Sequence, residues 1–462
     1  MAVACAVLCA MVGRGLLAAT SEQEVNVRWL AATWLVVACI STAMALCQYF
    51  GVEDWFAPWI SHAGDGTAFA NLRQRNQFAS LTSMGLLALV YLQTTQPLTQ
   101  RTTRVHSLWP FAALLLLATG NAVSSSRTAA VQWLLIALLG WGWRVHLPTG
   151  ARRLLWLAVP LYVVMAVLMP QMAAHASTVQ SNALGRMADA TGGGRVALYS
   201  NVWDLVLQHP WLGWGWRELA YAHYAQAFGQ RFPLILDNAH NLPLHLAVEL
   251  GVPFALLVCV AVVWCVLRGK PWREAAPQRQ LAWGVLLLLG VHSLTEYPLW
   301  YGPFLMTAGL CVGLLCSPPS LEKQNAPRTT IFIAQAATIL IAIAAYAGWD
   351  YHRMSQIYLS PDARDSAYAD DTLAKAQHSF IYARHTRFAE LVTTHVTPQT
   401  APRVLALSAD LLHYSPEPRV IQALIESATM LHLDDVAVFH LARFKDVFPK
   451  EYAAWSVLTK TP

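Results

Sequence analysis

The sequence predicts an all-α polytopic membrane protein with about ten transmembrane helices, a large periplasmic loop and a C-terminal periplasmic helical tail resembling tetratricopeptide hairpins. Of the 462 residues, 56% are hydrophobic and only 12% are charged, whereas soluble domains carry about 25% charged residues. The mean hydropathy is +0.40, so the apolar residues need lipid as a solvent. Apolar stretches recur along the chain, and from Asp350 onward the composition becomes charged again.

The apolar stretches are long enough to be helices that cross a bilayer, which takes about 20 residues. Six precede a long polar segment and four follow it. They are Ala2–Thr20, Arg28–Phe50, Phe78–Thr94, Leu108–Val123, Ala129–Val145, Leu154–Met172, Leu242–Leu267, Leu281–Leu294, Phe304–Cys316 and Thr330–Trp349.

Positive charges in alternate loops predict the orientation of these helices. Loops rich in Lys and Arg stay in the cytoplasm, which places residues 51–76, 173–241 and 350–462 outside, in the periplasm of a bacterial inner membrane. The first helix itself directs insertion, so no signal peptide is needed. The cytoplasmic residues would be Arg101, Arg104, Arg144, Arg152, Arg153, Arg268, Lys270, Arg273, Arg279, Lys323 and Arg328.

Four regions follow from this topology: N-terminal membrane helices (1–172), a large periplasmic loop (173–241), C-terminal membrane helices (242–349) and a periplasmic tail (350–462). The scheme puts Met1 outside with no preceding helix. Two explanations are open: the N-terminus is translocated without a helix before it, or the natural chain begins further upstream.

The tail shows the periodicity of amphipathic helices, for example at Leu407, Leu411 and Leu412. Breaks at Ser415–Pro418 and Leu433–Asp434 separate these helices, which indicates stacked helical hairpins. The eight cysteines all lie in apolar stretches without C-x-x-C spacing, so they are interpreted as small core residues. The net charge of +5 is modest and predicts no nucleic-acid partner.

Polar and aromatic residues gather at the predicted outer face. Each has an ordinary structural explanation: Asn241 and Pro243 form a normal helix start, and His245 with Glu249 is interpreted as a hydrogen-bonded pair rather than a metal site. Six segments contribute, namely Asn71–Gln77, Ser124–Thr128, Gly192–Arg195, Trp211–Glu218, Asp237–His245 and His292–Tyr301.

Taken together, the six segments indicate a binding site, because ionisable residues at a membrane edge are costly and usually functional. Arginine suits phosphate, and the tryptophans of Trp211–Trp216 offer flat faces for sugar rings. A nearby histidine would remove a proton from a hydroxyl. This combination suggests transfer of a glycan from a lipid diphosphate to an alcohol. The arginines are Arg73, Arg75, Arg127, Arg195 and Arg217.

Three motifs resemble those of a known family. His240-Asn241, nine residues and then Gly251 is similar to the H-[N/S/Q]-x9-G-x-x-[G/T/Y] signature of the O-antigen ligase and polymerase superfamily. The sequence departs from this signature at its last position, where Phe254 replaces Gly, Thr or Tyr. Asn71–Phe78 and His292–Tyr301 look like the N-L-x-Q-x-N and H-S-x-x-E-Y-P-L-W-Y motifs of bacterial protein O-oligosaccharyltransferases, the pilin glycosylation ligases of PglL type. The resemblance runs from about residue 65 to the end.

The resemblance implies a glycosyltransferase that moves an oligosaccharide en bloc from undecaprenyl diphosphate to Ser or Thr of pilin or another periplasmic protein. No metal and no other cofactor would be needed. His240 would be the general base, and Arg195 and Arg127 would hold the diphosphate and stabilise its departing charge. The implied substrate-binding residues are Arg73, Gln74, Arg75, Gln77, Trp214, Arg217, Asn241, Glu296 and Tyr297.

Other functions stay open. The same chemistry would serve an O-antigen ligase acting on lipid A–core, or an O-antigen polymerase; the helical tail favours a protein acceptor. A lipid-linked glycan transporter would also bind the diphosphate. It should carry ionisable residues deep in several helices, whereas Arg14 is the clear mid-helix charge here.

Overall fold

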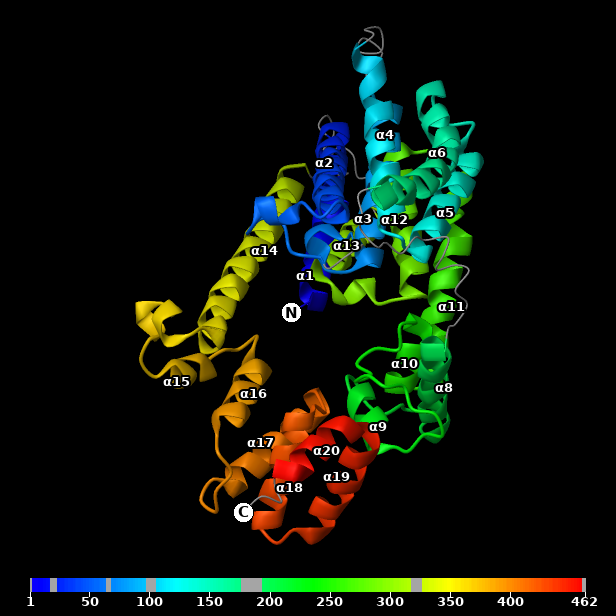
Figure 1. Cartoon of the computed structure of the whole chain (residues 1–462). Coiled ribbons are helices and arrows are strands. Elements are labelled where there is room, and N and C mark those ends of the chain that lie inside the picture. Colours follow the sequence, from blue (N-terminus) through cyan, green and yellow to red (C-terminus); the bar gives the residue numbers. More distant parts are fainter. Residues whose placement is uncertain are drawn as a thin grey trace. The chain divides into compact units, whose positions relative to one another are not determined.

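The computed structural model describes residues 2–16, 23–63, 68–96, 105–175, 193–316 and 326–458, and the described residues form helices without strands (Figure 1). They form two compact units. The first comprises residues 1–191 and 261–340, and the second comprises 192–260 and 341–462. The predicted features Arg101, Arg104, Gly192 and Lys323 lie outside the described residues.

The first unit is a bundle arranged around α3 (Arg75–Thr94), which packs against α2, α4, α5, α6 and α12. Almost every α3 residue from Gln77 to Tyr91 is buried. Its other helices are α1 (Ala2–Leu16), α2 (Gln23–Tyr49), α4 (Val105–Val123), α5 (Arg127–Trp143), α6 (Thr149–His175), α12 (Pro277–Ser293), α13 (Gly302–Leu315) and the first part of α14 (Ala326–Ser355).

Glycines allow α1 and α13 to approach each other at backbone distance. A Cβ atom on Gly309 or Gly313 would lie 2.3 or 2.0 Å from the carbonyl oxygens of Ala6 and Ala10, respectively. In the same way, a Cβ atom on Gly13 of α1 would lie 2.2 Å from the Leu310 carbonyl oxygen of α13. Small residues four apart are typical of helix pairs in membranes, where close van der Waals contact drives association.

Each of the ten predicted apolar stretches is helical over most of the residues that the structure describes. Among the residues that the structure describes, three helices are long and apolar enough to cross a membrane: Asn26–Tyr49, Thr149–Met172 and Val252–Arg273. Ala4–Arg14, Leu108–Val123 and Gly302–Leu315 are shorter apolar helices. The membrane character is therefore supported, and the number of ten spans stays a prediction.

One predicted helix is wrong. Leu242–Leu267 was expected to be continuous, but it is divided into α10 (Leu242–Leu250) and α11 (Val252–Gly269). Gly251 interrupts it with φ of 89° and ψ of 157°, a backbone conformation that is essentially restricted to glycine. α10 packs against α8 (Gly193–Gln208) in a core of its own.

The second unit joins the large loop to the tail. The loop contributes α8 and α9 (Leu219–Ala225), α10 follows directly after it, and the tail runs from the end of α14 through consecutive packed helices (Figure 1). The predicted breaks at Ser415–Pro418 and Leu433–Asp434 are confirmed. The tail helices are α15 (Thr372–Gln377), α16 (Ala383–Thr393), α17 (Ala401–Tyr414), α18 (Pro418–Met430), α19 (Asp434–Val447) and α20 (Pro449–Leu458).

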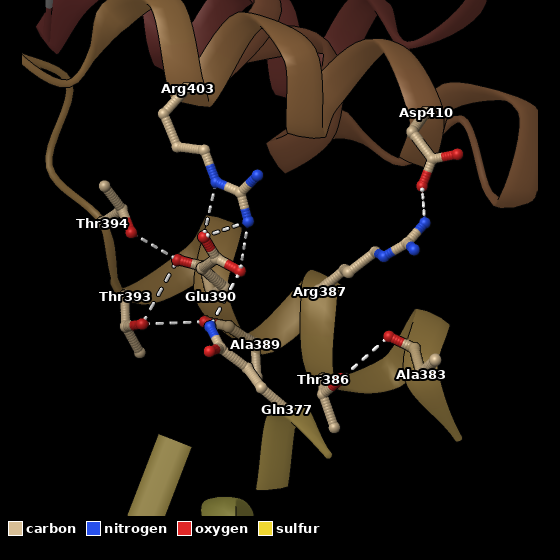
Figure 2. Close-up of polar contacts among 10 residues, drawn as sticks. All are labelled: Gln377, Ala383, Thr386, Arg387, Ala389, Glu390, Thr393, Thr394, Arg403 and Asp410. Carbon is tan, nitrogen blue, oxygen red and sulfur yellow. Dashed lines mark hydrogen bonds and ion pairs between the residues drawn. The ribbon is translucent and has the colours of Figure 1, made fainter. Parts of the chain in front are cut away.

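Polar contacts bind α16 to α17 (Figure 2). The Arg403 guanidinium donates two hydrogen bonds of 2.9 and 3.1 Å to the Glu390 carboxylate, and Arg387 donates to Asp410 at 2.7 Å. These residues lie on the outside of the hairpin, so each pair contributes at most about 1 kcal/mol. The apolar core of the tail therefore carries its stability, while these pairs fix the register of the two helices.

The loop is anchored in the tail's core through α9. Tyr224 is fully buried among Leu407, Leu411 and Phe444, and its hydroxyl lies 2.9 Å from His440 Nδ1. Arg231, which follows α9, forms an ion pair with Asp446 at 3.4 Å. The tail therefore supports the loop that carries several predicted site residues.

Candidate active site

In the first unit, three of the predicted motifs meet at Asn76. Its side-chain amide donates to Glu296 Oε1 at 3.1 Å, and its side-chain oxygen accepts from the Ser126 hydroxyl at 2.5 Å. Ser126 is also the N-cap of α5, where it accepts the Ala129 N–H. Asn76 therefore joins the segments Asn71–Gln77, Ser124–Thr128 and His292–Tyr301, which the sequence predicted to converge.

A second buried chain of polar contacts lies inside the helix bundle, one turn further along α3 from Asn76. Ser80 Oγ lies 2.7 Å from His292 Nδ1 and accepts a hydrogen bond of 2.7 Å from Gln132. Gln132 in turn accepts from Ser83 at 3.0 Å. Because buried polar groups are costly when unpaired, this network fixes α3, α5 and α12 relative to one another.

The turn before α3 is held by a residue far upstream. Gln48 of α2 donates to the Ala70 carbonyl at 2.9 Å and accepts the Ala70 and Phe69 N–H groups at 2.7 and 3.0 Å. The chain then passes through Arg73 with φ of 56°, a left-handed conformation that is uncommon for residues with a side chain. Arg73 is exposed at this point.

The remaining predicted residues of the first unit lie close to these helix starts. Gln74 is the N-cap of α3 and accepts the Gln77 N–H at 2.7 Å. Arg127 is exposed at the first residue of α5, and Tyr297 stacks on Tyr301 with centroids 6.0 Å apart. Arg75 Nη1 and Gln77 Oε1 are buried without a hydrogen-bond partner among the described residues, which makes both atoms candidate ligand contacts.

In the second unit, His240 lies at the start of α10. Its φ is 50°, and its N–H donates to Asn238 Oδ1 at 2.8 Å. Asn241 is the N-cap of α10 and accepts the Leu244 N–H at 3.0 Å, which confirms the predicted helix start. The left-handed conformation of His240, followed directly by the capped start of α10, holds the His240 backbone in one orientation. Strained backbone conformations of this kind cluster at functional sites.

The end of α10 is tied to the tryptophan-rich turn that carries Arg217. The N–H groups of Trp214 and Gly215 donate to the carbonyls of Val248 and Glu249 at 2.9 and 3.0 Å. A Cβ atom on Gly251 would lie 2.1 Å from the Trp211 oxygen. The glycine of the family signature is therefore required by close backbone contact, and α10 connects His240 to this turn.

Glu249 is the buried carboxyl in this connection. Burial raises its pKa to about 7, although the backbone N–H groups of Arg217 and Leu219 donate to it and oppose that rise. Its neighbour His245 lies 3.4 Å away, and burial lowers the His245 pKa to about 4. Because burial keeps His245 neutral near pH 7, the contact is not an ion pair between two charged groups.

The other predicted residues of this unit differ in their surroundings. Trp214 is partly buried, donates from its indole nitrogen to the Leu205 carbonyl at 3.0 Å and packs edge-on against His209. Arg195, in the first turn of α8, is exposed, as is Arg217, which has φ of 69° and lies 6.0 Å from the Tyr414 ring. The sugar-binding role of Trp214 and the diphosphate-binding roles of the arginines stay predictions.

Within the described residues, no group of three or more His, Cys, Asp or Glu side chains could hold a metal ion. Metal-independent chemistry stays a prediction. His245 Nε2 and Glu249 Oε2 lie 3.4 Å apart on one face of α10. Glu249 Oε2 has no hydrogen-bond partner among the described residues, so the predicted hydrogen bond between the two side chains is not formed through this oxygen.

Several residues that hold the site together were not among the predicted site residues. Asn76 and Ser126 lie inside motifs that the sequence indicated, and their place in these polar motifs was the available signal. Gln48, Ser80 and Gln132 offered a similar signal, since each is a polar residue within an apolar helix. Such residues face a protein interior more often than lipid.

Three family models match the chain, and together they cover the predicted site. Residues 111–259 match the model described as O-antigen ligase, and this range contains Arg127, Arg195 and His240. Residues 68–92 match the model described as protein glycosylation ligase. Residues 280–462 match the C-terminal model of the virulence factor membrane-bound polymerase. None of the three models covers half of the chain by itself, but together they confirm the resemblance carried by the motifs.

More particularly, the chain is similar to two proteins of Acinetobacter baylyi. It is 25% identical to the general O-oligosaccharyltransferase over 70% of this chain and 56% of that protein. It is 24% identical to the ComP-specific O-oligosaccharyltransferase over 63% of this chain and 52% of that protein. The chain spans little more than half the length of these curated relatives.

Proposed function

We propose that this protein is a glycosyltransferase that moves an oligosaccharide en bloc from undecaprenyl diphosphate to a Ser or Thr hydroxyl of a periplasmic protein such as pilin. The observation that carries the proposal is its similarity to two proteins named as O-oligosaccharyltransferases. The site would lie at the periplasmic face of the bacterial inner membrane. The proposed reaction uses Arg127, Arg195 and His240, which lie in the range matched by the O-antigen ligase model.

In the proposed reaction, the acceptor oxygen attacks the anomeric carbon of the first sugar, and His240 takes the hydroxyl proton. The bond between that carbon and the phosphate oxygen breaks, so that undecaprenyl diphosphate leaves with the bonding electrons. Arg127 and Arg195 would stabilise the charge that develops on it. The other substrate-binding residues would be Arg73, Gln74, Arg75, Gln77, Trp214, Arg217, Asn241, Glu296 and Tyr297.

A second candidate function is polymerisation of lipid-linked repeat units, which the match of residues 280–462 to a polymerase model favours. The acceptor would then be a sugar hydroxyl on another lipid-linked unit. The donor and the departing diphosphate would be the same, so only the identity of the acceptor separates the two functions.

Reconstitution of the purified full chain with a synthetic lipid-diphosphate oligosaccharide tests the proposal. Pilin, lipid A–core and a second portion of donor are offered as acceptors in parallel, with and without a chelator. Mass spectrometry should detect a pilin glycopeptide carrying the intact oligosaccharide in both conditions. Longer lipid-linked glycans without glycopeptide would identify a polymerase, a modified lipid A–core would identify a ligase, and chelator-sensitive transfer would refute the expected metal independence.

A further inference from the structure

The outer surface of α8 carries an apolar stripe that the proposed chemistry does not use. Val196, Trp203 and Leu207 are 67, 54 and 60% exposed, and their spacing of seven and four residues places them on one narrow face of the helix. The opposite face, including Val202, Leu205 and Val206, is buried against the core that contains α10. α8 is therefore apolar on two sides, only one of which is covered within its unit.

The stripe continues beyond the helix into the tryptophan-rich turn. Trp211 is 76% exposed, Leu212 is 84% exposed and Trp216 is 56% exposed. In contrast, Trp214 between them points inward and hydrogen-bonds to Leu205. Alternation of inward and outward side chains thus concentrates large apolar groups on the surface, and exposed apolar patches of this kind mark interaction sites.

The turn lies at the start of α11, a helix whose length and composition suit a membrane span. The N–H of Val252, the first residue of α11, donates to the Pro210 carbonyl at 2.8 Å, and Gly251 is in close contact with the Trp211 backbone. Val252–Arg273 is long and apolar enough to span a bilayer. The backbone contacts therefore set Trp211 and Leu212 at the same level as the first residue of that span.

We propose that Trp203, Leu207, Trp211, Leu212 and Trp216 form an interfacial anchor that inserts into the surface of the bilayer at which α11 begins. Trp is favoured at this level because its ring is apolar while its indole N–H reaches water. An amphipathic helix in this position buries its apolar face about 5–10 Å into the boundary between headgroups and acyl chains. The anchor would hold the loop that carries Arg195 and Arg217 at the level where a lipid headgroup lies.

The anchor can be tested with spin labels on the full chain in nanodiscs made from phospholipid alone. Leu207→Cys, Trp211→Cys and Leu212→Cys each receive a nitroxide in a background in which the eight native cysteines are replaced. Asp204→Cys and Gln208→Cys are the matched controls, because both residues are exposed on α8 but lie to one side of the stripe. Relaxation by oxygen, which partitions into lipid, is compared with relaxation by a water-soluble nickel chelate.

Labels on the stripe should collide more often with oxygen than with nickel and report a depth of about 5–10 Å, whereas the control labels should show the reverse. Equal nickel accessibility at stripe and control positions would overturn the proposal. Protection of the stripe from both reagents would also overturn it, because a protein surface would then cover these residues. Since the nanodiscs contain no donor, contact with its polyprenyl chain cannot produce the expected result.

A second measurement avoids replacement of the native cysteines. Benzoylphenylalanine in place of Leu207 or Trp211 should form photo-crosslinks to phospholipid, which mass spectrometry detects as a mass increase of the labelled peptide. The same amino acid in place of Asp204 should give no lipid adduct. Crosslinks from Leu207 or Trp211 to peptides of this chain or of a second copy, in place of lipid, would refute the anchor.

Discussion

The side-chain amide of Asn76 and the carboxylate of Glu296, 220 positions apart in the chain, are joined by a hydrogen bond of 3.1 Å. Ser126 completes the junction from the opposite side of Asn76. Through these contacts, one amide fixes the starts of α3 and α5 relative to the segment that follows α12. Residues at this junction therefore influence both the stability of the bundle and the geometry of the predicted substrate-binding residues around it.

Replacement of the junction amide should destabilise the bundle. Asn76→Ala removes one donor to the Glu296 carboxyl group and the acceptor for Ser126, and each intramolecular hydrogen bond contributes about 0.5–1.5 kcal/mol. We expect a lower midpoint of thermal unfolding for the purified protein and reduced glycan transfer. Gln208→Ala, which removes an exposed amide on α8, is the control and should leave both quantities unchanged. A wild-type midpoint in Asn76→Ala would contradict the role of this junction.

The proposed general-base role of His240 can be tested separately from its backbone conformation. Asparagine tolerates a positive φ, so His240→Asn retains the start of α10 while removing the base. The transfer rate should fall by about 10²–10⁴-fold without loss of thermal stability. His432→Asn is the control because His432 also has a positive φ, of 57°, and is exposed in the tail. If His240→Asn transferred glycan at the wild-type rate, the histidine would not be the base.

The buried carboxyl of Glu249 should make stability depend on pH. Its pKa rises from an ordinary 4.5 to about 7, so the folded state binds this proton more tightly than the unfolded state. The resulting stability is fully present below about pH 4.5 and is lost as the pH rises through 7. With about 1.4 kcal/mol per unit, the loss approaches about 3 kcal/mol at pH 8.

Glu249→Gln removes this titration but keeps an oxygen that can accept the Arg217 and Leu219 N–H groups. The variant should therefore unfold at a higher temperature than the wild type at pH 8, and the difference should disappear at pH 4.5. The other titratable and charged groups near this carboxyl, His245, Arg217 and Glu218, are present in both proteins. A difference independent of pH would show that the carboxyl is not buried in its protonated form.

The glycine between α10 and α11 should tolerate no side chain. Gly251→Ala places a Cβ atom 2.1 Å from the Trp211 oxygen and at φ of 89°, a conformation that costs about 1–3 kcal/mol for other residues. We expect a low yield of folded protein or a clearly lowered unfolding midpoint. Gly348→Ala is the matched control, since no atom lies within 4 Å of a Cβ at that position. Equal folded yields for the two variants would contradict the close contact.

The sequence was sufficient to predict the helices and several of their ends. Apolar runs predicted each helix of the first unit, and Asn241 with Pro243 predicted the start of α10. The motifs around Asn76 and Glu296 were correctly expected to converge, because both would lie at the same ends of neighbouring helices. These features follow from local composition and from hydrogen-bonding groups within a few residues, which a single sequence displays directly.

Tertiary structure alone decided where the helix 242–267 is interrupted and which tryptophans face inward. Apolar residues continue on both sides of Gly251, and close contact with the Trp211 backbone, 40 residues earlier in the chain, accounts for the position of the break. The same contacts bury Glu249, turn Trp214 into the core and leave Trp211 exposed. Burial and pKa depend on neighbours that are distant in sequence, and these neighbours are defined only once the chain has folded.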